Sequence, residues 1–233
     1  MVVSFQVLDW AAHADGRLRQ STEAGARATP PAMPMMLRRR LTPLGQAAIA
    51  AAYGAGAKAG VHYVFASRHG EFQRSLRVLE ALAAEQPLSP ADFSLCVHNA
   101  LAGLLSIATG ALAGHTAIAA GPDSLAGGLL EAAALLAADP ATRVLLAYFD
   151  DDLPAPYDAF QLEPAAGPLA LAVLLGSPSV DCAAIQFVAT PRLSAPSSAT
   201  ALPARAFLRF LAENLLSAEA GGARFQVAWC RAA

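Results

Sequence analysis

Residues 116–138 read TAIAAGPDSLAGGLLEAAALLAA, and this stretch decides the fold. A short run suited to a strand, Thr116 to Ala120, is followed by a Gly-Pro turn and then by a long apolar segment, Ser124 to Ala138. A strand, a tight turn and a buried helix in this order are typical of a nucleophile elbow, where a reactive side chain lies at a helix N-terminus. We therefore expect a strand over residues 116–120 and a helix over residues 124–138.

The segments on either side alternate between strand and helix in the same way. Apolar and β-branched runs predict further strands at Val2–Ala11, Val61–Ala66, Arg143–Phe149, Leu169–Leu175 and Ala223–Trp229. Helical spacing and caps predict helices at Met35–Tyr53, Glu71–Glu85, His98–Thr109 and near Ala204–Leu216, and Ser89-Pro90 opens another helical segment. This alternation predicts an α/β fold in which a layered, mostly parallel sheet carries helices on both faces. With 233 residues, the chain suits a single domain over residues 1–233.

Composition excludes several classes of protein. Hydrophobic residues make up 55% of the chain and charged residues 15%, which is too apolar for a disordered protein. A net charge of -2 provides no overall basic field, so we expect no nucleic-acid partner. The least polar stretch, residues 93–122, is interrupted by His98, Asn99, His115 and several glycines, so we expect no membrane span.

The expected compartment is the cytoplasm. The N-terminus lacks a basic region and a cleavage pattern, and we see no signal peptide. Three cysteines, Cys96, Cys182 and Cys230, have no metal-ligand spacing. No glycine-rich phosphate loop is present either, so we expect neither a metal nor a cofactor.

Several expected helices are apolar nearly all round, which predicts that both of their faces are covered. A single sheet covers only one face, so we expect a homo- or hetero-oligomer. On this hypothesis, a charge within Val97–Leu105, such as Leu101→Glu, should break the oligomer or lower solubility.

Ser124 is the candidate nucleophile at the turn, but the surrounding pattern is not G-x-S-x-G. The alternative is that Asp123 and Ser124 simply cap the helix. A second candidate site is Ser67-Arg68-His69-Gly70-Glu71, which follows an expected strand where α/β proteins place ligands. Arg68 and His69 would bind an anionic or acyl ligand there, unless Arg68 only pairs with Glu71.

Cys96, His98 and Asn99 form another polar group in an apolar setting. Cys96 and His98 are a possible thiolate pair, but a buried cysteine and a hydrogen-bonded histidine are the more usual interpretation. Arg38, Arg39 and Arg40 form a short basic run, either a docking point for an acidic partner or a solvated helix face. Asp150-Asp151-Asp152 could attract a cation, but we interpret this run as solubilising charge because such loop carboxylates more often have that role.

These motifs together resemble those of a known family. Ser67–Glu71, Leu88-Ser89-Pro90 with Phe93-Ser94, Val97–Ala100 with Ala102-Gly103, Thr116–Gly121 and Glu131-Ala132 resemble the short β-ketoacyl synthase-like proteins. These proteins, also described as chain-length-factor-like, accompany aryl-polyene and xanthomonadin-type pigment pathways. The resemblance covers most of the first 180 residues.

The resemblance implies the N-terminal half of a thiolase-like fold. A full ketosynthase carries its nucleophilic cysteine at the elbow and two histidines in a second half, whereas this turn reads Gly121-Pro122-Asp123. Condensation needs a thiolate to hold the acyl chain, so independent condensing activity is not expected. Arg68, His69, His98, Asn99 and Gly121 are then candidate binding residues.

The expected function is an accessory one in fatty-acid or polyketide-type pigment assembly. The protein would pair with itself or with a ketosynthase, shape an acyl tunnel or hold an acyl carrier protein. One alternative is an acyltransferase or thioester hydrolase with Ser124 or Cys96 as nucleophile and His69 or His98 as base. The other is a non-catalytic module that binds an acyl chain or an acyl carrier protein.

Overall fold

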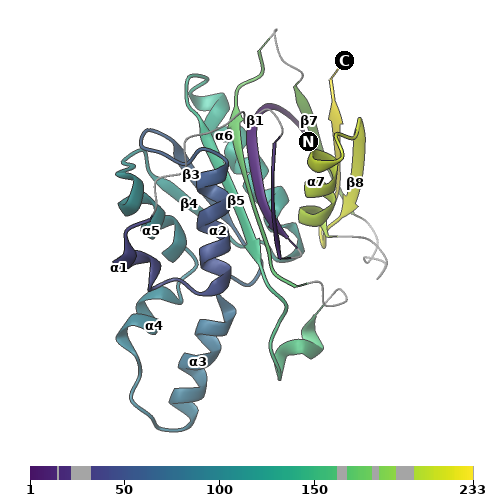
Figure 1. The fold of residues 1–233 in the computed structure, drawn as a ribbon. Coiled ribbons are helices and arrows are strands. Elements are labelled where there is room, and N and C mark those ends of the chain that lie inside the picture. The colour runs from purple at the N-terminus through teal and green to yellow at the C-terminus, as the bar shows by residue number, and fades with distance from the viewer. Residues whose placement is uncertain (15, 22–32, 162–166, 180–183, 193–201, 233) are drawn as a thin grey trace.

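The computed structural model describes residues 1–14, 16–21, 33–161, 167–179, 184–192 and 202–232 (Figure 1). Its strands are β1 (Val2–Ala14), β2 (Arg17–Gln20), β3 (His62–Ala66), β4 (His115–Ile118), β5 (Val144–Asp150), β6 (Leu169–Gly176), β7 (Ile185–Pro191), β8 (Ser217–Gly221) and β9 (Phe225–Arg231). Its α-helices are α1 (Met35–Arg38), α2 (Pro43–Gly54), α3 (Phe72–Ala83), α4 (Pro90–Leu95), α5 (Ala100–Thr109), α6 (Ser124–Ala138) and α7 (Pro203–Ala212). Two 3-10 turns lie at Gly121–Asp123 and Tyr157–Phe160.

The strands form one mixed sheet rather than a mostly parallel one. Their order is β4-β3-β5-β6-β1-β7-β9-β8, with β2 paired to β1. Strands β4, β3 and β5 are parallel, and all the other pairs are antiparallel. Successive parallel strands need a crossover such as a helix, and α6 is the crossover from β4 to β5, which lie on either side of β3. The described return from β5 to β6 has only a 3-10 turn, and the strands run antiparallel there.

Helices cover both faces of the sheet, as predicted, because its central strands are apolar on both sides. In β5, Leu146 and Tyr148 face one core while Leu145 and Phe149 face the other. This alternation follows from the two-residue period of a strand. Helices α2 and α5 bury their apolar sides in the second of these cores, and α6 and α7 in the first. The result is a layered α/β structure.

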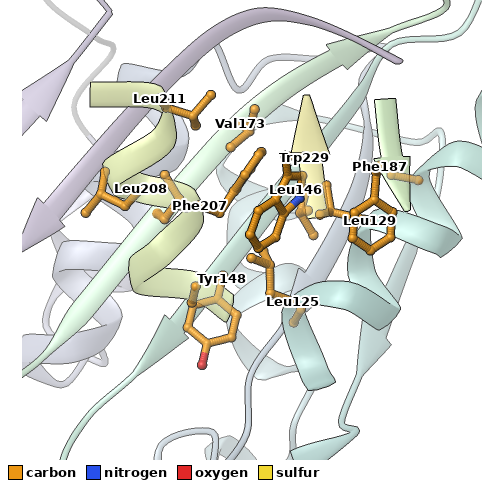
Figure 2. Close-up of a cluster of buried hydrophobic side chains, with 14 of the residues drawn as sticks. Leu125, Leu129, Leu146, Tyr148, Val173, Phe187, Phe207, Leu208, Leu211 and Trp229 are labelled. Atoms are coloured by element: carbon orange, nitrogen blue, oxygen red, sulfur yellow. The ribbon is translucent and has the colours of Figure 1, made fainter. Parts of the chain in front are cut away.

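Helix α6 is covered by the chain's own C-terminal segment. Leu125 and Leu129 of α6 lie in one buried cluster with Phe187 of β7, Phe207 of α7 and Trp229 of β9 (Figure 2). The Trp229 ring lies 6.0 Å from the Phe187 ring and 5.2 Å from the Phe207 ring, measured between centroids. The C-terminal segment, β7–β9 and α7, therefore supplies part of the apolar cover of α6 within the chain itself.

Several boundaries differ from the predicted ones. The expected helix 35–53 is two helices, because Pro43 lacks an N–H and Thr42 caps a new helix, its hydroxyl accepting from Gly45 N at 3.0 Å. The sequence analysis missed β2, β7 and β8. Ser89 caps α4 and Gly110 ends α5 with a φ of 67°, as predicted.

Leu101 lies in the core and not at an interface. Its side chain is 1% exposed, in the cluster between α2, α5 and the sheet. Leu101→Glu would therefore destabilise the fold itself and is no test of assembly. Within the described part of the chain, no helix combines the length and the apolarity needed to cross a membrane.

Helices α3 and α4 project from the body as an arm next to α5 and β4 (Figure 1). Half of the 14 exposed large apolar side chains in the described residues lie on this side, between positions 79 and 112. They are Leu79, Leu82, Leu88, Phe93, Val97, Ile107 and Leu112. Strand β4 is also an edge strand, with β3 as its neighbour among the described strands. We call these seven residues together with β4 the edge surface.

Candidate functional site

Three loops meet where the parallel strands end. The segments Ser67–Glu71, Ala119–Asp123 and Asp150–Asp152 follow β3, β4 and β5. The carboxyl ends of parallel strands share one edge of a sheet, and ligands of α/β proteins bind there. We call this region the strand-end site.

Asp150 organises the first of these loops. Its carboxylate accepts hydrogen bonds from the Ser67 hydroxyl at 3.0 Å, Arg68 N at 2.8 Å and His69 N at 2.9 Å. The Tyr148 hydroxyl donates to the same carboxylate at 2.5 Å. The interpretation of this acidic run as solubilising charge was wrong for Asp150. A carboxylate directly after a buried strand, beside a neighbouring strand that ends in Ser67, was the signal that would have identified it.

The elbow between β4 and α6 holds no free nucleophile. Ser124 is fully buried; its hydroxyl donates to Gly121 O at 2.7 Å and Ser67 O at 3.0 Å and accepts from Ala120 N at 3.0 Å. These contacts join the turn to the β3 loop. Gly121 stands at the turn with a φ of 59°, and a Cβ at this position would meet no atom within 4 Å. The elbow geometry is present, with a glycine at its apex.

Asp123 does not cap α6 through its side chain but holds the C-terminal hairpin. Its carboxylate accepts from Arg224 N at 2.8 Å, in the turn between β8 and β9. A Cβ on Gly222 would lie 1.6 Å from Asp123 Oδ1, so a side chain at this position would displace the Asp123 carboxylate. The elbow is therefore fixed to the segment that covers α6.

His98 lies beside two of the three loops. Its Nε2 is 3.0 Å from Ile118 O, and its ring lies against Gly70, where a Cβ would be 3.2 Å from His98 Nδ1. Cys96 is not paired with it: the thiol donates to Phe93 O at 3.0 Å. Asn99 is exposed at the start of α5 and makes no side-chain cap. The free thiols of the described residues are Cys96 and Cys230, and Cys182 lies outside the described residues.

His69 lies between two adjoining cavities of about 40 and 170 Å³, which it lines together with Asp151 and Asp152. Burial lowers the pKa of His69, the Arg68 charge lowers it further, and Asp150 opposes both effects. Its Nε2 has no hydrogen-bond partner among the described residues. Burial raises the pKa of Asp151, and the neighbouring carboxylates of Asp152 and Asp150 add to this.

Glu71 pairs with Arg74 and not with Arg68. Arg74 Nε lies 3.4 Å from Glu71 Oε2, and its Nη1 lies 2.7 Å from Asp92 Oδ1 on α4. Glu71 also bonds the Thr42 hydroxyl, and Arg74 Nη2 donates to Arg40 O at 2.7 Å. This buried network, which the sequence analysis missed, joins the arm to the turn before α2.

Arg38, Arg39 and Arg40 are exposed and lie outside the strand-end site. Arg38 lines an open groove of about 710 Å³ whose walls include Leu41, Ile49 and Tyr53. Among the described residues, no group of three or more His, Cys, Asp or Glu side chains is placed to hold a metal ion.

The comparisons with known proteins agree with this geometry. The family model described as "Beta-ketoacyl synthase, N-terminal domain" matches residues 8–229. The chain belongs to this β-ketoacyl synthase family. Comparison with curated proteins finds no match.

Solved structures of the family share its thiolase-like fold. One chain of the structure titled ketosynthase (ApeO) in complex with its chain length factor (ApeC), from Xenorhabdus doucetiae, superposes with a TM-score of 0.80 at 25% identity. The match covers 98% of this chain and 100% of that one. A β-ketoacyl synthase from Burkholderia phymatum STM815 has a TM-score of 0.62 at 12% identity over 84% of this chain and 67% of its own. The ishigamide ketosynthase/chain length factor has a TM-score of 0.60 at 14% identity, and the match covers 82% of this chain and 68% of that one.

Proposed function

We propose that this protein is a ketosynthase-like accessory subunit, similar to a chain length factor, in the assembly of aryl-polyene-type pigments. It pairs with a ketosynthase and has no condensing activity of its own. The observation that carries the proposal is the end-to-end match to one chain of a structure that contains a ketosynthase and its chain length factor.

The elbow supports the absence of condensing activity. Acyl transfer needs a side-chain nucleophile at the helix N-terminus, and Gly121 at the apex has none. Ser124 is fully buried, and its hydroxyl donates to Gly121 O and Ser67 O. The rival proposal of an acyltransferase or hydrolase gains no support from Cys96 either, because its thiol is bonded within its own turn.

The edge surface is the place where we expect the ketosynthase to bind. An edge strand offers unpaired backbone groups to another chain, and natural monomers usually protect such an edge with charge. Here β4 is flanked by Val97, Ile107 and Leu112, which are all exposed. Such an apolar patch next to an open edge is typical of a protein–protein interface.

The basic run supports a second partner, an acyl carrier protein. Arg38, Arg39 and Arg40 are exposed, and an acidic partner would be steered to them by charge. The apolar groove beside Arg38 gives that partner a surface to bury.

The test is size-exclusion chromatography of the protein mixed with a candidate partner ketosynthase from the same organism. The expected result is stable co-elution, which Ile107→Glu abolishes because it places a charge on the edge surface. Leu216→Glu is the matched control, since Leu216 is also an exposed aliphatic residue but lies directly before β8. Co-elution that survives Ile107→Glu would contradict the proposed surface, and failure of the unmodified proteins to associate would contradict the accessory function.

An intact mass spectrum after incubation with malonyl- and acyl-loaded carrier protein tests whether the protein forms a covalent acyl intermediate. We expect an unchanged mass. A stoichiometric acyl increment that disappears in Ser124→Ala or Cys96→Ala would favour the acyltransferase instead.

A further inference from the structure

A second cavity, of about 460 Å³, lies away from the strand-end site. It opens between the β1–β2 strand pair and the C-terminal segment, and it is lined by Leu211 and Asn214 at the end of α7. The strand-end cavity touches α7 at Ala204 and Arg205, at the start of that helix. Arg205 and Leu211 are six residues apart on α7, so the two cavities meet this helix about 9 Å apart along its axis.

Arg231 lines this cavity, and its guanidinium is held in a fixed position by neighbouring residues. Its Nε donates to Leu215 O at 3.1 Å, and its guanidinium lies over the Phe210 ring at 5.0 Å from the centroid. Phe210 is fully buried, so the ring is a rigid support. The terminal nitrogens Nη1 and Nη2 make no hydrogen bond or ion pair with any described residue. A guanidinium held in this way has lost its conformational entropy before a ligand arrives.

The rest of the wall is polar and suited to oxygen atoms. Gln20, Ser21 and Asn214 line the cavity with two amides and a hydroxyl. Asn214 has a φ of 50°, a left-handed conformation that asparagine tolerates better than most residues. Trp10 and Leu211 add apolar surface beside them.

Asp9 does not cancel the charge of Arg231. Its carboxylate is 3% exposed and accepts a hydrogen bond from Trp10 N at 2.7 Å. Asp9 and Arg19, the other charged residues of the wall, both have partners within the protein. The positive charge open to the cavity is therefore that of Arg231.

We propose that this cavity binds a small molecule with a carboxylate or phosphate group, which the Arg231 guanidinium holds through two parallel hydrogen bonds. A planar fork of donors matches both of these groups. The volume lies within the usual range of about 300–1,000 Å³ for small-molecule sites. The C-terminal segment that covers α6 thus also forms half of a ligand site, one that is independent of the accessory function.

The test is a titration of the full chain followed by ¹H–¹⁵N NMR, with inorganic phosphate, malonate and the uncharged malonamide as probes. We expect saturable shifts of the Trp10, Asn214 and Arg231 signals with phosphate, with malonate or with both, and none with malonamide. A response to phosphate alone or to malonate alone identifies the source of the anion. Failure of both anions to give saturable shifts at these residues would overturn the proposal.

Two variants test ligand binding by side chains whose replacement should leave the fold intact. Arg231→Lys keeps the charge but loses the fork, and it should weaken binding at least tenfold. Asn214→Gly keeps the backbone conformation while removing an amide, and it should weaken binding without unfolding the protein. Arg209→Ala is the matched control, because Arg209 lies on α7 outside the cavity and pairs with Glu213 at 3.0 Å. Wild-type affinity in both Arg231→Lys and Asn214→Gly would contradict the assignment.

Discussion

Asp150 accepts hydrogen bonds from Ser67, Arg68 and His69, so the loop after β3 is ordered by the protein itself. Bonds to a charged acceptor are the strong ones, each worth roughly 1.5–3 kcal/mol. Ser124 then ties the same loop to the elbow through Ser67 O. Because these loops are hydrogen-bonded to one another, the site is a rigid surface. Such a surface suits an accessory subunit that shapes its partner better than it suits an enzyme whose loops move during a reaction.

The ionisation of Asp151 makes the stability of the protein depend on pH. Burial raises its pKa above the ordinary 3.8, so the folded state keeps the proton to a higher pH than the unfolded state does. Stability from this group is therefore full below about pH 3.8 and is lost as the pH rises through the folded pKa. We expect Asp151→Asn to raise Tm at pH 7 by about 1–3 °C, with a gain that shrinks towards pH 4.

The control for this thermal melt is Asp139→Asn. The exposed Asp139 accepts bonds from Thr142 and Ala141, which lower its pKa, so its ionised form is favoured in the folded state. Its substitution should give no gain at pH 7. An unchanged or lower Tm in Asp151→Asn at pH 7 would show that burial of Asp151 costs nothing.

At the level of elements, Gly128 sets how closely α6 approaches the sheet. A Cβ there would lie 2.7 Å from Leu146 Cδ1 and 3.0 Å from Ala66 Cβ. Gly128→Ala should therefore lower the free energy of unfolding by about 1–3 kcal/mol, the usual effect of overpacking. Urea denaturation of the wild type and of Gly128→Ala measures this difference in the free energy of unfolding.

Gly103→Ala is the matched control on α5. A Cβ at Gly103 would meet no atom within 4 Å, so the better helix propensity of alanine should stabilise the protein by about 0.5–1 kcal/mol. If both substitutions had the same effect, the close approach of α6 would not be under constraint.

The sequence predicted those elements whose pattern is local. Strand β5 and helix α6 followed from continuous apolar runs, and the end of α5 followed from Gly110. The parallel or antiparallel pairing of the strands could not be predicted in this way, because both kinds of strand have the same two-residue period and differ only in their connections. Strand β7 alternates between buried and less buried residues over Ile185–Thr190, but the sequence analysis missed it.

The candidate site was predicted in part. The sequence analysis named Ser67–Glu71, His98 and the elbow as separate candidates, and the fold brings these three together. The sequence analysis did not identify Asp150 or Arg74, whose contacts with Ser67 and Asp92 span 83 and 18 positions of the sequence. No short-range pattern contains such a contact. Cys96 and Asn99 were named with His98 only because they are close to it in the sequence.

At the level of the whole molecule, Trp229 joins the C-terminal segment to α6. It is fully buried against Phe187 and Phe207 (Figure 2), and its Nε1 has no hydrogen-bond partner among the described residues. We expect Trp229→Ala to reduce the free energy of unfolding by about 3–5 kcal/mol. In the wild-type protein, circular dichroism and tryptophan fluorescence should report one coincident transition in urea.

Leu216→Ala serves as the control for this experiment, because Leu216 belongs to the same segment but is exposed. It should leave the midpoint nearly unchanged. Two separate transitions in the wild type would mean that the C-terminal segment folds independently of the sheet, and a small effect of Trp229→Ala would have the same meaning.

The cover of α6 has a consequence for how the protein is made. Helix α6 ends at Ala138, and Trp229 follows about 90 residues later. A ribosome adding roughly 5–20 residues per second needs about 5–20 s to produce that length. During this interval Leu125 and Leu129 of the nascent α6 lack their contacts with Phe207 and Trp229, so we expect the newly made chain to bind chaperones.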